Sequence, residues 1–205
     1  MTTQQTADEQ LRTIKQSLRS MMNGVASRKM REAGMTYKVN YGVELPRLQD
    51  FSKEFLSDRD LATKLWQEDI RECRLLAAML MPQDDFQEDL AELWVEQMRF
   101  PEEADCAVFH LIGTQPYASD LAFRCMADEK PLKRYVGYQL TNRLLMRGMR
   151  PTSRDGQELL DNIATDIKGT NSYVSRAATN VLSRYMDCGI GEERMAQAML
   201  KKLSD

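Results

Sequence analysis

The chain has 205 residues, a formal net charge of −3 and 42% hydrophobic residues. This length is sufficient for one domain with a sizeable core or for a compact array of repeats. Acidic side chains outnumber basic ones, 31 to 28, which excludes a uniformly basic coat for nucleic acid but not a local basic face.

The cysteines and the single histidine argue against metal sites. The four cysteines show no C-x-x-C spacing and are Cys73, Cys106, Cys125 and Cys188. Each falls in a segment of helical pattern, so we expect reduced and mostly buried thiols. His110 lies between Phe109 and Leu111, which indicates a packed histidine rather than a ligand. We therefore expect no metal and no organic cofactor.

Hydropathy indicates a soluble protein. No apolar run approaches the ~20 residues that a membrane span requires. The N-terminal sequence MTTQQTADEQ lacks the apolar core of a signal peptide. We expect a cytoplasmic, monomeric protein with no membrane partner, and a disordered segment over residues 1–6.

From residue 7 onward, apolar residues recur every three or four positions, which is the helical period. In the first expected helix, 7–24, Leu11, Ile14 and Leu18 share one face. The further helices are expected at 46–56, 59–67, 70–81, 85–98, 102–113, 117–127, 131–147, 156–168, 171–187 and 191–203. Proline residues fall between these segments, where a missing N–H does least damage. The fold class is therefore all-α.

The expected helices also repeat in pairs. The stretches LATKLWQEDIRECRLLAAML, LAELWVEQMRFPEEADCAVFHLIG, LAFRCMADEKPLKRYVGYQLTNRLL and LLDNIATDIKGTNSYVSRAATNVLSRY each contain two apolar helices around a polar joint. This pattern favours a HEAT-like solenoid of helical hairpins over an unrelated helix bundle. We predict one helical-repeat domain over residues 1–205, in which the helices at 131–147 and 171–187 line a concave surface.

Two motifs carry a family resemblance. The segment Tyr41-Gly42-Val43-Glu44-Leu45-Pro46 is followed by Leu65-Trp66 and then by Glu72 with Arg74-Leu75-Leu76-Ala77. This series resembles the start of the DNA alkylation repair enzyme family, the AlkD-like helical-repeat DNA glycosylases. In the first motif, we expect Gly42 and Pro46 to shape a rigid turn between helices rather than to carry chemistry.

The resemblance implies a catalytic carboxylate. Asp105, eight residues before Gly113, falls where the family has its catalytic aspartate. Such a carboxylate stabilises positive charge on the sugar when a cationic alkylated purine leaves DNA. The family's tryptophans are missing: Phe100 and Pro101 precede Asp105, and Asn180 replaces a later tryptophan. Asp105 could equally be a solvated residue near a helix start.

The resemblance also implies double-stranded DNA as the partner. The expected DNA contacts are Lys133, Arg134, Arg143, Arg176, Asn180 and Arg184. Two functions stay open: a DNA-binding protein that releases cationic N-alkylated purines weakly through a degenerate site, and a non-catalytic scaffold that binds a protein partner.

Overall fold

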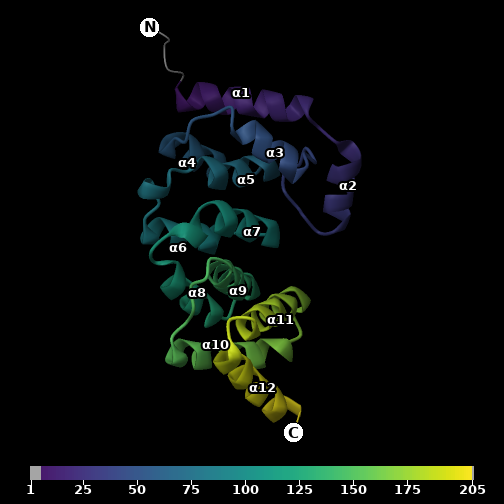
Figure 1. The fold of residues 1–205 in the computed structure, drawn as a ribbon. Coiled ribbons are helices and arrows are strands. Elements are labelled where there is room, and N and C mark those ends of the chain that lie inside the picture. The colour runs from purple at the N-terminus through teal and green to yellow at the C-terminus, as the bar shows by residue number, and fades with distance from the viewer. Residues whose placement is uncertain (1–5, 205) are drawn as a thin grey trace. The chain divides into compact units, whose positions relative to one another are not determined.

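The structure is a computed structural model that describes residues 6–204, and these residues are almost entirely helical (Figure 1). They form twelve α-helices, two short 3-10 helices and no β-strand beyond an isolated bridge between Val39 and Ile70. The all-α prediction is confirmed. The chain divides into two compact units, Met1–Gln87 and Glu88–Asp205, here called unit 1 and unit 2. The expectation of a single domain stays a prediction.

Unit 1 contains five α-helices and a 3-10 turn. They are α1 (Ala7–Ser20), α2 (Gly24–Glu32), α3 (Leu45–Ser52), α4 (Arg59–Gln67), α5 (Arg71–Leu80) and η1 (Gln83–Asp85). The expected first helix, 7–24, ends four residues early, and α2 was not expected at all. Of the segment expected to be disordered, residues 1–5 lie outside the described residues, whereas Thr6 caps α1 by accepting a hydrogen bond from the backbone of Glu9.

A buried carboxylate on α5 holds the segment that precedes α3. Glu72 is fully buried, and its two carboxylate oxygens accept hydrogen bonds from the backbone N–H groups of Tyr41 and Val43, both at 3.1 Å. Arg71 Nη1 donates to the carbonyl of Val43 at 2.9 Å and to Glu72 at 3.1 Å. A buried charge is tolerated only when it is paired and hydrogen-bonded in this way. The two family motifs are thus two halves of one structural clamp.

Gly42 lets that segment contact α2. Its φ is +71°, and a Cβ built on it would lie 2.3 Å from the carbonyl oxygen of Asn23 and 2.5 Å from the nitrogen of Ser27. Only glycine fits a left-handed conformation pressed this closely against another backbone. The N-terminus of α2 therefore rests directly on the Tyr41–Val43 segment.

Unit 2 contains the remaining helices. They are α6 (Glu88–Gln97), α7 (Pro101–His110), η2 (Ile112–Thr114), α8 (Ala118–Met126), α9 (Pro131–Met146), α10 (Ser153–Ile167), α11 (Ser172–Met186) and α12 (Ile190–Ser204). The hairpins α8–α9 and α10–α11 pair closely, as α4–α5 does in unit 1. These pairings match three of the four repeats expected from the sequence.

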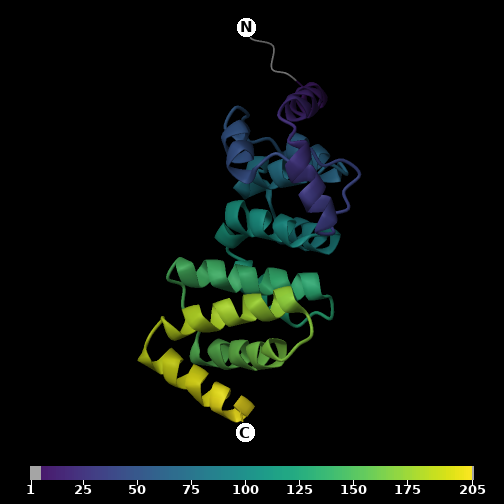
Figure 2. The same ribbon diagram turned by 90° about the vertical axis from the view of Figure 1, so that its right-hand side faces the viewer.

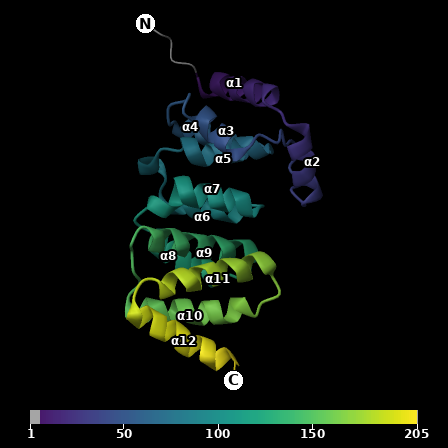
Figure 3. The same ribbon diagram turned by 45° about the vertical axis from the view of Figure 1, so that its right-hand side comes forward.

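The second helices of successive hairpins form one layer of unit 2. α9 packs against α7 on one side and against α11 on the other, as Figures 2 and 3 show for α9 and α11. α9 and α11 correspond to the helices expected at 131–147 and 171–187, and that they line a concave surface stays a prediction. Large side chains beneath this layer, including Tyr138 and Tyr185, are fully buried. They hold the helices at fixed positions, so the polar side chains on the layer's outer face have defined neighbours.

Candidate functional site

The carboxylate of Asp105 on α7 is held by two side chains of α9. Tyr135 Oη donates a hydrogen bond to Asp105 Oδ1 at 2.8 Å, and Gln139 Nε2 donates to the same oxygen at 2.6 Å. Gln139 Nε2 also lies 2.6 Å from Tyr135 Oη. Tyr135 and Gln139 are four residues apart and therefore share one face of α9. Within residues 6–204, Asp105 Oδ2 accepts no hydrogen bond, so one carboxylate oxygen is free to act.

The surroundings of Asp105 change its acidity. Partial burial of the carboxylate raises the pKa of Asp105 above its ordinary value, while the hydrogen bonds from Tyr135 and Gln139 act in the opposite direction. Burial beside the carboxylate likewise raises the pKa of Tyr135, so the phenol stays protonated and can only donate to Asp105. The arrangement is a carboxylate fixed by neutral donors, which is suited to meeting a transient positive charge.

An open pocket of about 240 Å³ adjoins Asp105. It is lined by Asp105, Val108, Phe109, Gln139, Asn142, Arg143 and Met146. The pocket therefore has an acidic end and a cationic end, with apolar side chains between them. Phe109 and Met146 are 51% and 54% exposed, which is unusual for large apolar residues beside polar groups.

Arg143 forms the cationic end of the pocket by stacking on Phe109. Its guanidinium carbon lies 4.4 Å from the centre of the Phe109 ring. The Nε atom is buried and makes no hydrogen bond to any residue of the described chain. A Cβ on Gly113 would lie 2.7 Å from Arg143 Cγ, so this glycine provides the room for the stack. An arginine fixed on an aromatic face is prepared to meet a phosphate with little loss of side-chain entropy.

The neighbouring helix α11 extends this polar face. Tyr173 contacts Tyr135 edge to face, with ring centres 5.5 Å apart. Further along α11, Arg184 Nε donates to Asn142 Oδ1 at 2.7 Å. Arg176 and Asn180 are exposed and form no hydrogen bond or ion pair with another residue in the described range. These α11 positions recur every three or four residues, so they share one side of the helix.

Lys133 and Arg134 are engaged elsewhere. Lys133 Nζ forms ion pairs with Glu96 at 2.6 Å and with Asp128 at 2.9 Å. Arg134 Nη2 lies 2.7 Å from Asp166, a nearly buried carboxylate that also accepts a hydrogen bond from Tyr138 at 2.6 Å. The structure thus brings Arg143 to the Asp105 pocket but not Lys133 or Arg134. Their expected DNA contacts stay predictions and would require these ion pairs to be shared or broken.

The sequence interpretation missed four residues of this site: Phe109, Tyr135, Gln139 and Tyr173. Phe109 was considered only as a neighbour of His110, whose ring it contacts edge to face at 4.9 Å. The missed signal was an exposed aromatic one turn after Asp105 on the same helix. The two expected tryptophan positions before Asp105 instead build the start of α7, where Phe100 is the N-cap and Pro101 the first helical residue.

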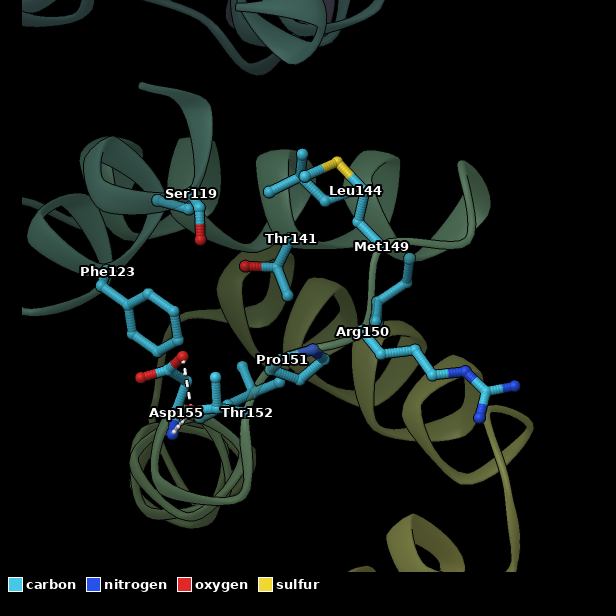
Figure 4. Close-up of a pocket in the computed structure, with 12 residues that line it drawn as sticks. Ser119, Phe123, Thr141, Leu144, Met149, Arg150, Pro151, Thr152 and Asp155 are labelled. Atoms are coloured by element: carbon cyan, nitrogen blue, oxygen red, sulfur yellow. Dashed lines mark hydrogen bonds between the residues drawn. The ribbon is translucent and has the colours of Figure 1, made fainter. Parts of the chain in front are cut away.

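A second pocket in unit 2, of about 110 Å³, lies among α8, α9 and α10 (Figure 4). Its lining includes Phe123, Leu144 and Leu159. At its rim, Thr152 Oγ1 donates to Asp155 Oδ2 at 2.8 Å and accepts from the Asp155 backbone at 3.2 Å. These groups cap the start of α10. Thr152 and Asp155 therefore serve the helix cap, and the site described above is the better candidate for chemistry.

No group of three or more His, Cys, Asp or Glu residues within residues 6–204 could hold a metal ion. Cys73, Cys106 and Cys125 are buried and form no disulfide within the described residues, and burial strongly raises the pKa of the Cys73 thiol. No helix among residues 6–204 is long and apolar enough to cross a membrane.

Comparisons with known proteins were made on the sequence and on the fold. The sequence model of the DNA alkylation repair enzyme family matches residues 14–188. A solved structure, described as a new family of proteins related to the HEAT-like repeat DNA glycosylases with affinity for branched DNA structures, matches with a TM-score of 0.81 and 17% identity. The match covers 94% of this chain and 83% of that one. No curated protein sequence matches significantly. The structural match confirms the HEAT-like helical-repeat fold.

Proposed function

Because the chain belongs to the DNA alkylation repair enzyme family, we propose that it binds double-stranded DNA through the outer face of α7, α9 and α11. The face offers Arg143, Arg176, Asn180 and Arg184 for phosphate oxygens. Lys133 and Arg134 belong to the same expected set, but their ion pairs make them the weaker candidates. We further propose that the protein acts as a monomer.

The proposed reaction is weak release of cationic N-alkylated purines, with Asp105 as the catalytic residue. The observation that carries it is the Asp105 carboxylate, which Tyr135 and Gln139 fix beside an open pocket while Oδ2 stays free. When the bond between the purine and C1′ of the sugar breaks, its electron pair neutralises the purine cation. The positive charge that develops on the sugar is stabilised by the carboxylate. Water then adds to C1′, and its proton passes to Asp105.

Because the family's tryptophans are missing, we expect base release to be slow. The pocket offers Phe109 and Arg143 as its exposed flat groups, and the DNA backbone would be held less firmly than by larger aromatic surfaces. Small misplacements at a reacting centre can cost about a hundredfold in rate. We expect no release of neutral lesions, because their departure requires protonation of the base and Asp105 is not placed as an acid for it.

A single-turnover assay tests the reaction. Excess protein is mixed with a duplex that carries one 7-methylguanine, and the released base is quantified by chromatography. Wild-type protein is expected to exceed the uncatalysed rate, and Asp105→Asn is expected to match it. Asp105→Asn should bind the duplex equally or slightly better, because a negative charge near phosphates is removed. The control is Asp120→Asn, an exposed aspartate on α8 that should leave the rate unchanged.

A second function is DNA binding without turnover. The structurally similar protein family has affinity for branched DNA, so the branched ligand is the natural second substrate for the assay. Binding to a four-way junction, combined with equal base release by wild-type protein and Asp105→Asn, would establish a fold kept for binding alone. Failure to bind any DNA at low ionic strength would instead favour the protein-scaffold function.

A further inference from the structure

Unit 1 contains a strongly basic segment within an acidic chain. Between Gln10 and Arg31 there is no Asp or Glu, although the formal net charge of the whole protein is −3. The basic residues of this segment are Arg12, Lys15, Arg19, Arg28, Lys29 and Arg31. Such a local concentration of one sign of charge is the electrostatic footprint of an anionic partner.

The cations of this segment differ in the partners of their side chains. Lys15 forms an ion pair with Glu68 at 3.0 Å, and Arg31 Nη2 lies 3.3 Å from Ser27 Oγ. By contrast, Arg19, Arg28 and Lys29 are exposed and make no ion pair or hydrogen bond through their side chains to any residue in the described part of the chain. We call these three residues the α2 basic surface: Arg28 and Lys29 lie on α2, and Arg19 lies at the end of α1, just before it.

Three other cations of unit 1 are neutralised by nearby carboxylates. Lys53 pairs with Asp50 at 2.7 Å, Lys64 pairs with Asp8, and Arg71 pairs with Glu72. The carboxylate nearest in sequence to the α2 basic surface is Glu32, at the last position of α2. Neither Arg28 nor Lys29 forms an ion pair with Glu32, so no carboxylate among the described residues neutralises this surface through an ion pair.

α2 is a poor contributor to the core but is firmly positioned. Its one buried residue is Ser27, and it projects from the side of unit 1 in Figures 1 and 3. Ser27 Oγ donates to the carbonyl of Asn40 at 2.7 Å, and the backbone N–H of Asn23 donates to the carbonyl of Tyr41 at 2.8 Å. The clamp formed by Glu72 and Arg71 fixes that segment in turn. The cations of α2 therefore stand on a rigid support, which reduces the entropy lost on binding.

We propose that Arg19, Arg28 and Lys29 contact the phosphate backbone of duplex DNA, as a second DNA-binding surface on unit 1. The proposal rests on the proposed function for its ligand, but it assigns that ligand to residues that lie outside the α7–α9–α11 face. Charge complementarity is the argument, since duplex DNA presents about one phosphate charge per 1.7 Å of helix axis. α2 has nine residues. Its strongly exposed large apolar side chains are Val25, within the helix, and Met22, just before it. Two such side chains offer little area to insert into a lipid bilayer.

The test measures how DNA affinity depends on salt. Each phosphate contact contributes about 0.9 to the slope of log Kobs against log salt concentration. Neutralising Arg19→Gln, Arg28→Gln and Lys29→Gln together should reduce the magnitude of the slope by about 3. The matched control neutralises Arg194→Gln, Lys201→Gln and Lys202→Gln on α12, which changes the net charge equally. The control should leave the slope at its wild-type value.

A further variant, Arg176→Gln with Arg184→Gln on α11, separates the two proposals. If only this α11 variant changes the salt slope of DNA binding, the α2 basic surface is overturned and the α11 face stands. If only the α2 variant changes the slope, the α2 surface stands and the proposed α11 face fails. Circular dichroism verifies folding, and Lys29→Glu alone replaces the triple variant if that variant is unfolded. Loss of binding to anionic phosphatidylserine vesicles, with an unchanged DNA slope, would overturn the proposal in favour of a membrane surface.

Discussion

Asp105 and Arg134 show that neighbouring side chains decide whether a charged group is available to a ligand. Both positions were expected from the family resemblance, and each lies on the helix expected for it. Asp105 faces neutral donors and an open pocket, whereas Arg134 lies against Asp166 on α10. The partner of Arg134 is 32 residues further along the chain, and periodicity alone could not reveal that contact. The family resemblance predicted which helix carries each functional group, but side-chain packing determines whether the group is available.

The raised pKa of Asp105 has a consequence for stability. A carboxyl whose pKa is higher in the folded state than in the unfolded state destabilises the fold when it is ionised. We expect Asp105→Asn to melt at the same or a higher temperature than wild type at pH 7. The difference should shrink as pH falls through the folded-state pKa of Asp105 and vanish below the unfolded value of about 3.9. Thermal unfolding followed by circular dichroism across this pH range measures it.

Asp120→Asn on α8 is the control for that measurement and should show no such trend. A melting temperature of Asp105→Asn that is lower than wild type at pH 7, and stays lower in acid, would mean that the ionised carboxylate stabilises the fold. Functional carboxylates often reduce stability in this way, because a site preorganised for a transient charge lacks that charge in the resting protein.

At the scale of elements, the helical period predicted most of the fold and failed at α2. The helices of the hairpins bury continuous apolar faces, so their pattern is visible in the sequence. α2 buries only Ser27 and is positioned by backbone contacts with the Tyr41–Val43 segment, so it leaves no apolar period to detect. Its signal was the stretch without Asp or Glu, which is a pattern of charge rather than of hydrophobicity. The motifs around Gly42 and Glu72 turn out to be the support for this helix.

Gly42→Ala tests this support. The substitution places a Cβ against the backbone of Asn23 and Ser27 in addition to straining φ. We expect it to reduce the free energy of unfolding by about 3 kcal/mol, since left-handed strain costs about 1–2 kcal/mol and the clash adds to it. Urea denaturation measures the loss. Hydrogen exchange should show faster exchange in α2 than in wild type.

Gly34→Ala is a matched control for the backbone strain. Gly34 has a φ of +91°, but a Cβ there would meet no atom within 4 Å. Gly34→Ala should lower the free energy of unfolding by about 1–2 kcal/mol, which is the cost of the backbone strain alone. Equal losses for the two variants would show that the close approach of Gly42 to α2 contributes nothing to the fold.

At the scale of the whole molecule, the acidic net charge and the proposed DNA binding are compatible because charge is unevenly distributed. In unit 2, Arg124 pairs with Glu88 and Glu92, and Lys133 pairs with Glu96, so many cations are neutralised where they stand. Within the described residues, Arg28 and Lys29 on α2 and Arg176 on α11 are exposed and form no ion pair. The net charge of the chain therefore does not argue against DNA binding. Which cations are paired with carboxylates is the better guide to a binding surface.

The single-domain prediction can be tested because each compact unit has one tryptophan. Trp66 in unit 1 is 3% exposed, and Trp94 in unit 2 is 1% exposed, so the fluorescence of each should change when its own unit unfolds. Trp94→Phe leaves a reporter for unit 1, and Trp66→Phe leaves one for unit 2. If residues 1–205 form one cooperative domain, the urea midpoint from fluorescence should equal that from circular dichroism in each variant.

Comparison within one variant is essential, because each substitution lowers stability by itself. Trp66→Phe also weakens a contact with Arg74, whose guanidinium carbon lies 4.0 Å from the centre of the Trp66 ring. Circular dichroism reports the helices of both units, so it provides the internal reference that fluorescence from one unit lacks. We expect coincident midpoints, because helical repeats couple through the interfaces between neighbouring repeats. Separate midpoints for fluorescence and circular dichroism would show that the units unfold independently, and the protein would then be two domains.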